Sequence, residues 1–360
     1  MPPDVISILL IPTRKTLVPG PCFLCQSSTI APMVRFAATG VRLDQALAFE
    51  ANTSRAKAQE WIEAGLVWVG GKVVTRASYK LKGETGGAHP PPPVPVSVAA
   101  EDIPLRVLYE DEDLIVINKQ AGMITHPAPG VYSGTLVNAI LGRFGLDASL
   151  GEREDADDTV RMKAQRLELV RPGIVHRLDK DTSGAIVVAR HEAAHRRLSQ
   201  AFAGRSVFKR YIALTAGVPQ GGTLSAPIGR HPVDRTRMHV GGVAARHAQT
   251  DFEVLGSVER HALVSTILHT GRTHQIRVHL KHLHTPILGD EVYGKPSDLI
   301  ARQALHAYEL RLQHPRTGKY LHFLAPIPTD MVRAWRLLGG VWPEDLITDA
   351  AGVNPAEPSW

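Results

Sequence analysis

The sequence predicts an α+β protein in which a small N-terminal domain precedes a larger C-terminal domain. Residues 41–74 have the pattern of two short helices followed by a hairpin. From residue 114 to about 335, strand-forming and helix-forming segments alternate irregularly, which is typical of an α+β domain. A proline-rich stretch at 89–96 separates the two regions. The 360-residue chain is therefore expected to contain a poorly ordered extension at 1–34, a small domain at 35–88, a linker at 89–100, a large domain at 101–340 and a tail at 341–360.

The composition favours a partner with negative charge. The chain has 41 Lys and Arg against 35 Asp and Glu, a formal net charge of +6, and basic residues bind polyanions by neutralising phosphates. No stretch approaches the roughly 20 apolar residues that a membrane-spanning helix needs, so we expect a cytoplasmic protein without membrane insertion. Cys22 and Cys25 have no second pair to complete a zinc site, so we expect two free thiols.

The first 32 residues differ in composition from the rest of the chain. No acidic residue occurs between Val5 and Leu43, and the segment mixes proline, serine and scattered basic residues. It lacks the apolar core and cleavage site of a secretory signal, although a transit peptide would also be poor in acids. Because organised sequence follows directly after Met33, we expect translation to start there.

The small domain contains a helix with a basic N-terminal end. Ser54 offers an N-cap for a helix at 55–62, and Gly65 ends that helix. Its first turns carry basic and polar side chains where free backbone N–H groups and the helix dipole favour phosphate. About fifty residues resemble the S4-like RNA-binding module, through Arg42-Leu43-Asp44, Ser54-Arg55, Gln59, Ile62, Gly65-Leu66-Val67 and Val69-Gly70-Gly71. The RNA contacts expected in this domain are Arg42, Ser54, Arg55, Lys57 and Gln59. A solvated helix with scattered charges is the alternative.

Two segments are expected to contribute nothing to a packed core. Residues 89–96 read HPPPPVPV, which predicts a polyproline-II spacer between the two domains. Residues 145–170 carry closely spaced acidic residues that cannot be buried together, so they predict a mobile surface insertion.

The clearest chemical pattern is the stretch from Gly173 to Gly184, which reads GIVHRLDKDTSG. An apolar, β-branched run at 185–189 follows and predicts a central strand. The polar cluster therefore lies on a loop that a sheet holds in place, where a reactive group is expected. Asp179 stands in this loop between two cations, Arg177 and Lys180. From residue chemistry alone, a surface loop with salt bridges would have the same pattern.

These twelve residues resemble the active-site motif of the pseudouridine synthases related to large-ribosomal-subunit synthases A and D. Other segments are similar to the same family, at 113–122 continuing to 136, at 205–213, and at 270–279 ending in Gly289-Asp290 and Tyr293-Gly294. Gln120 replaces the proline that is usual in the family. The resemblance spans roughly residues 41–335 and implies a mixed, mostly antiparallel sheet with a central cleft for RNA.

The resemblance implies an enzyme that isomerises uridine within RNA and that needs no cofactor and no metal. Asp179 corresponds to the family's nucleophile and Tyr211 to its active-site tyrosine, which would stack on the extruded base. Help in removing the proton from C5 is a second role open to Tyr211. Arg277 would pair with Asp179 and keep it ionised and oriented. Ile276 would form an apolar wall against the base, and Arg177 would fill the space that the base leaves.

Three other interpretations compete with this one. The histidines at 274, 279, 282 and 284 suggest a metal site, but they lack the helical i, i+4 pair with an intervening Glu and lie among cations. A glycoside hydrolase needs a second acid about 5–9 Å from the first, and only Asp181 is near in sequence. A non-catalytic RNA-binding protein on the same fold has no need of Asp179, Tyr211 and Arg277 together.

The substrate is inferred only from the resemblance. The combination of the S4-like module with the HRLDKDTSG loop is closest to the synthase D branch of the family. That branch implies large-subunit (23S) ribosomal RNA as the partner, with transfer RNA as the alternative. The sequence indicates no required protein partner. It leaves open whether Asp179 attacks C1′ of the ribose or removes the proton from C2′.

Overall fold

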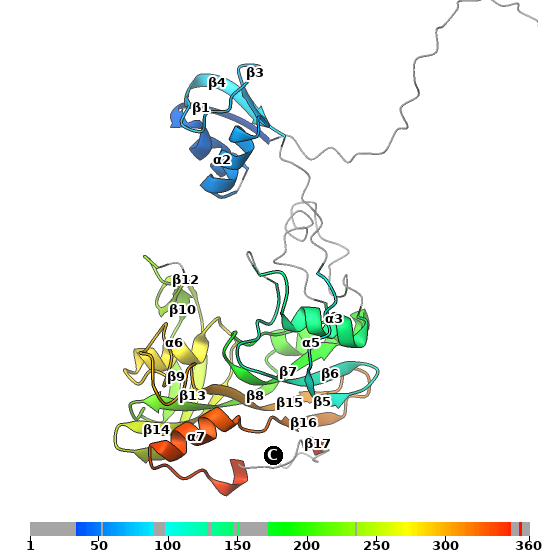
Figure 1. Ribbon diagram of the computed structural model, residues 1–360, viewed down its shortest axis with the longest axis vertical. Helices are drawn as coiled ribbons and strands as arrows, with labels where there is room; N and C mark the ends of the chain where they lie inside the picture. Colours follow the sequence, from blue (N-terminus) through cyan, green and yellow to red (C-terminus); the bar gives the residue numbers. More distant parts are fainter. Residues whose placement is uncertain are drawn as a thin grey trace, which may run out of the picture. The chain divides into compact units, whose positions relative to one another are not determined.

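In the computed structural model, the described residues are 34–51, 53–89, 98–127, 131–146, 150, 172–234, 236–346 and 353–354. The chain divides after residue 92 into two compact units, whose elements are labelled in Figure 1. The expectations about Met33, the two cysteines, the proline-rich linker and the insertion at 145–170 lie wholly or mostly outside the described residues.

In its described residues, the first unit is a four-stranded antiparallel sheet with two helices packed against it. Its strand order is β1-β4-β2-β3. Leu43 and Leu47 of the first helix and Ile62 of the second are fully buried against the sheet. Ser54 accepts the N–H of Lys57 and caps the second helix, as the sequence predicts. The elements are β1 (Val34–Arg42), α1 (Leu43–Glu50), α2 (Arg55–Glu63), β2 (Val67–Val69), β3 (Lys72–Val73) and β4 (Lys80–Ala88).

The sequence does not predict strand β4, because its residues, KLKGETGGA, include three glycines and few strand-forming side chains. The structure shows what the glycines are for. A Cβ on Gly86 would collide with the ring of Phe36, and a Cβ on Gly87 would collide with the indole of Trp68. Glycine at these positions lets the rings of Phe36 and Trp68 lie directly on the strand, while Leu81 and Ala88 of β4 are buried in the small core.

The second unit is built on a ten-stranded sheet in the described part of the chain, with strand order β5-β6-β7-β15-β8-β14-β13-β9 and β16 and β17 added beside β15. Neighbouring strands there pair antiparallel, except that β7 and β15 are parallel. The predicted mixed, mostly antiparallel sheet is thus confirmed. The strands of this sheet are β5 (Arg106–Glu110), β6 (Leu114–Lys119), β7 (Ser183–Ala189), β8 (Phe208–Ala216), β9 (Gly222–Ser225), β13 (Gln249–Val258), β14 (His261–Leu268), β15 (Leu305–Gln313), β16 (Tyr320–Leu324) and β17 (Val353–Asn354).

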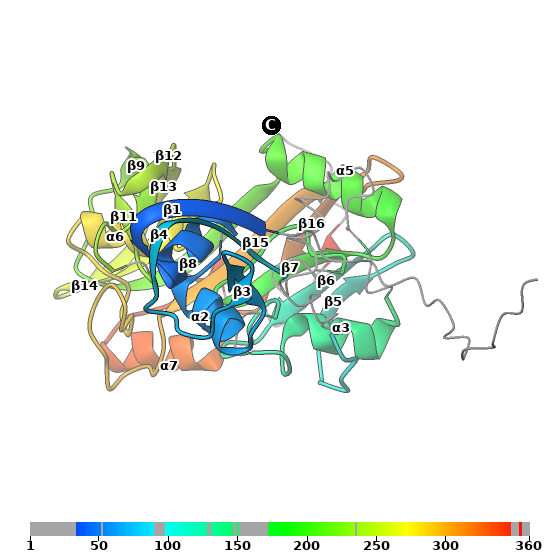
Figure 2. The same ribbon diagram turned by 90° about the horizontal axis from the view of Figure 1, so that it is seen from above.

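Helices cover both faces of the central strands. Leu114 and Val116 of β6 pack with α5, whereas Ile115 and Ile117 pack in the cluster that contains α3 and α7. Figure 2 shows α5 on one side of the sheet and α3 and α7 on the other. A strand buried on both faces needs apolar side chains at every position, which explains the continuous apolar runs in β6 and β7. The helices are α3 (Leu136–Phe144), α5 (Glu192–Ala203), α6 (Gln275–His282) and α7 (Thr329–Leu337).

A small three-stranded antiparallel sheet, in the order β11-β10-β12, packs beside α6. Its strands are β10 (Ile228–Arg230), β11 (Met238–Val240) and β12 (Val243–Arg246). The core of the unit continues past residue 340, because Trp342 and Leu346 are buried in it. Within the described ranges, no helix has the length and apolar character that crossing a membrane requires.

His306 on β15 is a buried, uncharged histidine in this core. Its Nε2 lies 3.1 Å from the carbonyl oxygen of Ala325, so Nε2 carries the proton, and its Nδ1 lies 2.9 Å from the hydroxyl of Ser183. Burial lowers the pKa of His306 from 6.5 to about 4. Between these two pH values the unfolded chain binds a proton at this residue that the folded chain does not bind. The stability of the fold therefore decreases as the pH falls from 6.5 to 4.

We expect His306 alone to contribute on the order of 2–3 kcal/mol to that loss. Urea unfolding at several pH values between 7 and 4.5 measures it. His306→Gln removes the titrating group, so its unfolding free energy should depend less steeply on pH than that of the wild type. Equal pH dependence of the two proteins would contradict the assignment.

Candidate active site

A cavity of about 360 Å³ opens in the second unit between the loop before β7, strand β8 and the loop that leads into α6. It brings together the residues that the sequence predicts for catalysis and base binding. These are Arg177, Asp179, Tyr211, Ile276 and Arg277, all of which line it. Asp179 is the only acidic residue among the described residues that line the cavity. The paired carboxylates of a glycoside hydrolase are therefore absent from this described lining.

Side chains from distant segments hold the backbone of the Asp179 loop, which we define as residues 173–182. Four successive carbonyl groups of this loop each accept a hydrogen bond. A backbone carbonyl that is removed from water needs a hydrogen-bond partner, and these donors supply it. The four bonds also leave the loop little freedom to move. Thr125 Oγ1 donates to the carbonyl of Leu178 at 2.7 Å, and the loop's own N–H of Thr182 donates to that of Asp179 at 3.1 Å. Lys119 Nζ donates to the carbonyl of Lys180 at 3.0 Å, and Arg302 Nη1 donates to that of Asp181 at 3.1 Å.

Lys119 is a buried lysine beneath the Asp179 loop, and it is 1% exposed. Its Nζ donates to the carbonyls of Gln120, Met123 and Lys180 at 3.0, 2.9 and 3.0 Å. Burial lowers the pKa of Lys119 to about 7, although nearby carboxylates attract its charge. Donation to three carbonyl groups uses all three hydrogens of the protonated ammonium group, so the charged form of Lys119 acts as a clamp that ties the end of β6 to the loop. The sequence places Lys119 in a family-like segment but does not predict this role.

Arg277 on α6 bridges two carboxylates. Its Nη1 donates to Asp179 Oδ2 at 3.1 Å, while its Nε and Nη2 donate to Asp290 Oδ2 and Oδ1 at 2.7 and 2.9 Å. The side chains of Arg277 and Asp290 are 6% and 0% exposed, so this is a buried bidentate pair. Burial opposes the charge of Arg277, but the bonds to the two carboxylates outweigh it and raise its pKa above the usual value. The guanidinium is thus charged and held in one orientation toward Asp179.

Asp290 is a residue of the site that sequence reasoning does not identify, since it appears there only within the Gly289-Asp290 pair. Its Oδ1 also accepts the N–H groups of Val292 and Tyr293, each at 3.0 Å. The Tyr293 ring centre lies 5.0 Å from Cζ of Arg277. One carboxylate therefore shapes its own turn, places an aromatic ring beside the guanidinium and binds the guanidinium. The family-like motif is the only signal for it in the sequence.

Tyr211 and Ile276 are buried residues that line the cavity, while Arg177, which also lines it, is exposed at the surface. Burial, reinforced by the charge of Asp179, raises the pKa of Tyr211 above its usual value. The phenol of Tyr211 therefore stays protonated near neutral pH. A flat ring with a hydroxyl donor and a branched apolar side chain suit the two faces and the polar edge of a base.

In the first unit, three of the predicted RNA contacts gather around one buried carboxylate. Arg42, Arg55 and Gln59 donate to Asp44 at 3.0, 2.9 and 2.8 Å. Hydrogen bonds from Arg42, and then from Gln59 and Arg55, hold the pKa of Asp44 well below its usual value although burial opposes them. The side chains of Arg42 and Arg55 remain 37% and 50% exposed. Asp44 thus fixes two guanidinium groups at the surface of this unit.

The two other predicted contacts of the first unit have local partners. Ser54 caps α2, and Lys57 Nζ pairs with Glu60 at 2.7 Å on the exposed surface. An exposed pair of this kind contributes little to stability, so Lys57 can exchange Glu60 for a phosphate at low cost. Contact of all five residues with RNA stays a prediction.

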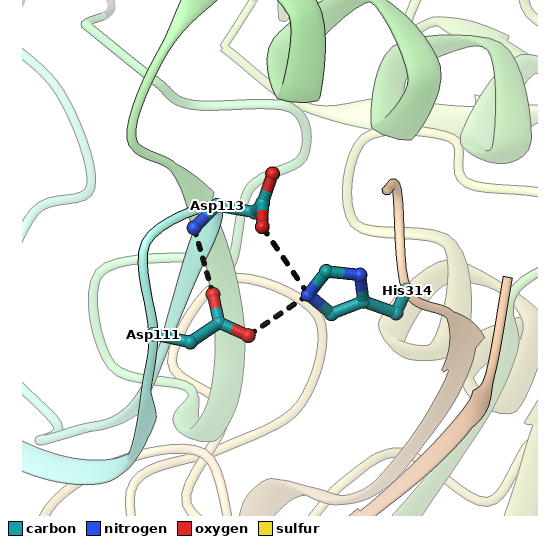
Figure 3. Close-up of side chains that lie close together, drawn as sticks. All are labelled: Asp111, Asp113 and His314. Atoms are coloured by element: carbon teal, nitrogen blue, oxygen red, sulfur yellow. Dashed lines mark hydrogen bonds and ion pairs between the residues drawn. The ribbon is translucent and has the colours of Figure 1, made fainter. Parts of the chain in front are cut away.

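One cluster of described residues has the geometry of metal ligands, and the residues lining the cavity do not include it. Figure 3 shows Asp111 and Asp113, between β5 and β6, beside His314. His314 Nε2 lies 2.9 Å from Asp111 Oδ2 and 3.6 Å from Asp113 Oδ2. Its Nδ1 accepts the N–H groups of Arg316 and Thr317 at 3.1 Å each, so Nε2 carries the proton and has no free lone pair for an ion. The cluster is a clamp between the turn that joins β5 to β6 and the end of β15. The histidines of α6 form no comparable group among the described residues.

Replacing His314 with alanine is expected to lower stability by about 1–3 kcal/mol, because Asp111 loses the hydrogen bond from Nε2 and the N–H groups of Arg316 and Thr317 lose their acceptor. Arg316 Nε lies 2.8 Å from Asp113 Oδ2 as an ion pair and continues to offset part of the negative charge. If the cluster is a clamp, a chelator leaves the thermal unfolding temperature of the wild-type protein unchanged. A decrease in that temperature with EDTA, restored by a divalent ion, would show a metal site instead.

Comparison with known proteins identifies the family of this chain. The family model for RNA pseudouridylate synthase matches residues 113–282, and that for the S4 domain matches residues 41–85. An uncharacterized RNA pseudouridine synthase of Chlorobaculum parvum is 43% identical over 320 residues, which cover 81% of this chain and 92% of that protein. Ribosomal large subunit pseudouridine synthase D of Vibrio parahaemolyticus is 39% identical over 326 residues, which cover 86% of this chain and 94% of that protein. A solved structure of human RNA Pseudouridylate Synthase Domain Containing 4 is 25% identical, with a TM-score of 0.48, and covers 66% of this chain and 95% of that one. The chain belongs to the RNA pseudouridine synthases, enzymes that isomerise uridine in RNA, and it carries an S4 domain in its first unit.

Proposed function

We propose that this pseudouridine synthase modifies large-subunit ribosomal RNA and that Asp179 is its nucleophile. The observation that carries the proposal is the position of Asp179, whose side chain is 18% exposed and accepts a hydrogen bond from the buried Arg277. It is also the only acid among the described residues that line the cavity. The Vibrio relatives are named ribosomal large subunit pseudouridine synthase D, which supports the proposed substrate.

The reaction breaks the bond between C1′ of the ribose and N1 of the uracil and joins C1′ to C5 of the same base. The proton on C5 leaves and N1 gains one, so nothing is oxidised, reduced or released. Asp179 begins this sequence either by attacking C1′ or by removing the proton from C2′. Either step needs a lone pair on the carboxylate, and Arg277 binds only Oδ2. An ionised carboxylate offers about four lone-pair sites, so lone pairs remain for the sugar.

The target base must leave its stack before it reaches Asp179. Tyr211 and Ile276 are placed to hold the extruded uracil between a ring and an apolar side chain. The raised pKa of Tyr211 supports stacking and hydrogen-bond donation over a role as the base that takes the C5 proton. Arg177, exposed on the Asp179 loop, suits the space that the base leaves, because a guanidinium can stack and donate hydrogen bonds at once.

In this proposal the S4 domain supplies affinity rather than chemistry, since phosphate contacts position a nucleic acid without reading its sequence. A chain that begins at Pro93 is expected to bind structured RNA roughly tenfold or more weakly, with a smaller dependence of affinity on salt. Its maximal single-turnover rate at saturating RNA should equal that of the full chain. Filter binding at several salt concentrations measures the first two effects. Unchanged affinity would refute this division of labour.

The substrate assignment is tested with purified full-length protein and two transcribed RNAs, the large-subunit ribosomal RNA and a pool of transfer RNAs. Pseudouridine is then mapped at nucleotide resolution in each RNA. The proposal predicts modification of defined uridines in the ribosomal RNA and none in the transfer RNAs. Modification of transfer RNA alone would replace the substrate while leaving the role of Asp179 intact.

A further inference from the structure

A chain of polar contacts leads from the small three-stranded sheet to Asp179. The N–H of Met238 on β11 donates to the hydroxyl oxygen of Tyr293 at 2.9 Å. That hydroxyl lies 2.8 Å from Nδ1 of His274, the residue just before α6. On the other side of the same ring, Nε2 lies 3.9 Å from Asp179 Oδ1. His274 also lines the cavity, so its ring connects a buried support to the proposed nucleophile.

The partners of the Tyr293 hydroxyl determine where the His274 ring carries its proton. A backbone N–H can only donate, so the hydroxyl oxygen accepts from Met238. Among the described residues, His274 Nδ1 is the only other partner of this buried hydroxyl, and the O–H group therefore donates to it. Nδ1 is then unprotonated and Nε2 carries the hydrogen. This tautomer also places an N–H group, rather than a lone pair, next to the carboxylate of Asp179.

Burial keeps the ring of His274 neutral and its surroundings keep it in place. Burial lowers the pKa of His274, although the charge of Asp179 opposes the shift. The backbone of His274 is left-handed, with φ of 56°, which is a strained conformation for a residue other than glycine. The buried amide of Gln275 supports it, because its Oε1 accepts from Thr270 Oγ1 and from the N–H of Arg272. The amide Nε2 of Gln275 donates to the carbonyl of Gln249.

We propose that His274 is a positioning residue whose Nε2–H hydrogen-bonds to Asp179 Oδ1 when RNA occupies the cavity. His274 and Arg277 then hold one oxygen each and fix the plane of the carboxylate. This inference rests on the proposed role of Asp179. The distance of 3.9 Å between His274 Nε2 and Asp179 Oδ1 exceeds an ordinary N–H···O bond by about 1 Å. Hydrogen bonds at catalytic sites are often long without substrate and shorten in the complex.

Tyr293 serves both partners of Asp179 in this arrangement. Its hydroxyl sets the tautomer of His274, and its ring centre lies 5.0 Å from Cζ of Arg277. The phenol ring and the His274 ring meet edge to face, with centres 5.6 Å apart. Tyr293→Phe keeps both ring contacts and removes only the hydroxyl. It therefore separates control of the His274 tautomer from packing beside Arg277.

The test compares His274→Asn with wild type in single-turnover reactions on the transcribed large-subunit ribosomal RNA. Asparagine tolerates a left-handed backbone but places no donor at the position of Nε2. We expect the maximal rate constant to fall about ten- to one-hundredfold, the effect of losing one hydrogen bond to a charged group. The dissociation constant for the RNA should be unchanged, because the bond forms with Asp179 and not with RNA. His274→Gln, whose amide reaches farther and can donate to Asp179, should recover part of the rate.

His284→Asn is the matched control. His284 is exposed, also has a left-handed backbone with φ of 59°, and is not among the residues that line the cavity. Its substitution should leave both the rate constant and the RNA affinity at wild-type values. A rate constant of His274→Asn equal to that of His284→Asn would overturn the proposal. A loss of RNA affinity in proportion to the loss of rate would also overturn it, since His274 would then be an RNA contact.

A spectroscopic measurement on the wild-type protein keeps the tautomer claim independent of any variant's folding. Nitrogen-15 shifts of the histidine rings, with His274→Asn identifying the signal of His274, distinguish a protonated Nε2 from a protonated Nδ1. The proposal requires protonated Nε2 in the wild type and a mixture of tautomers in Tyr293→Phe. Protonated Nδ1 in the wild type would refute it. Asp179→Asn is assayed in parallel. If it retains activity, the proposed nucleophile is wrong. If it is inactive while His274→Asn has the wild-type rate, only the role of His274 is refuted.

Discussion

Replacing Asp179 with asparagine is expected to slow pseudouridine formation by on the order of 10⁴-fold or more, as loss of a nucleophile does in other enzymes. Asparagine has nearly the size of aspartate, and its amide oxygen can still accept the hydrogen bond from Arg277 that Asp179 Oδ2 accepts at 3.1 Å. It can neither attack C1′ nor take a proton from C2′. The RNA affinity and the unfolding temperature should therefore stay close to wild type while the single-turnover rate collapses.

Asp181→Asn is the matched control for that experiment. Asp181 lies two residues further along the same loop, and Arg302 binds its backbone carbonyl rather than its side chain. Its substitution removes the same charge from the same loop and should leave most of the activity. If both variants lost activity equally, the negative charge of the loop would matter rather than the nucleophile, and the assignment of Asp179 would be wrong.

Replacing Arg277 with methionine is expected to reduce the rate by at least about one-hundredfold, because a misplaced reacting group costs about that much. Asp179 loses the donor that orients it. The same change should lower stability by about 3–5 kcal/mol, because Asp290, with a fully buried side chain, loses the cation that balances it. Single-turnover assays measure the first effect and urea unfolding the second.

Combining Arg277→Met with Asp290→Asn separates the two effects. The neutral amide removes the unbalanced buried charge, so the double variant should regain much of the lost stability. It should not regain activity, because nothing replaces the bond from Nη1 to Asp179. Arg277→Lys is expected to fail as well, since one ammonium group cannot reproduce the three directed bonds of the guanidinium. Recovery of the rate in the double variant would mean that Arg277 acts on stability alone.

The cavity residues that the sequence predicts each lie within a contiguous segment that resembles the family. Asp179 was identifiable because its loop has twelve informative residues in a row, and Tyr211 and Arg277 because each lies in a segment similar to the same family. The alternation of strands and helices predicted the α+β class, and the apolar runs predicted buried strands. These are local patterns, and local patterns are what one sequence contains.

The supports of the site could not be predicted, because each is a contact between segments far apart in the chain. Lys119 precedes the Asp179 loop in the sequence and Arg302 follows it. Both bind backbone carbonyls of the loop, and any residue type has such a carbonyl, so the sequence of the loop does not reveal these contacts. Asp290 binds Arg277 only because a turn brings it back to α6. Strand β4 was missed for a related reason, since its glycines serve the rings of residues on other strands.

The most direct test of the nucleophile is pseudouridine mapping of ribosomal RNA from cells that lack this protein and carry no copy, the wild-type gene or Asp179→Asn. We predict that defined large-subunit sites disappear without the protein, return with the wild type and stay absent with Asp179→Asn expressed at the same level. Sites restored by Asp179→Asn would contradict the central claim, because the enzyme would then act without the carboxylate on which its cavity is built.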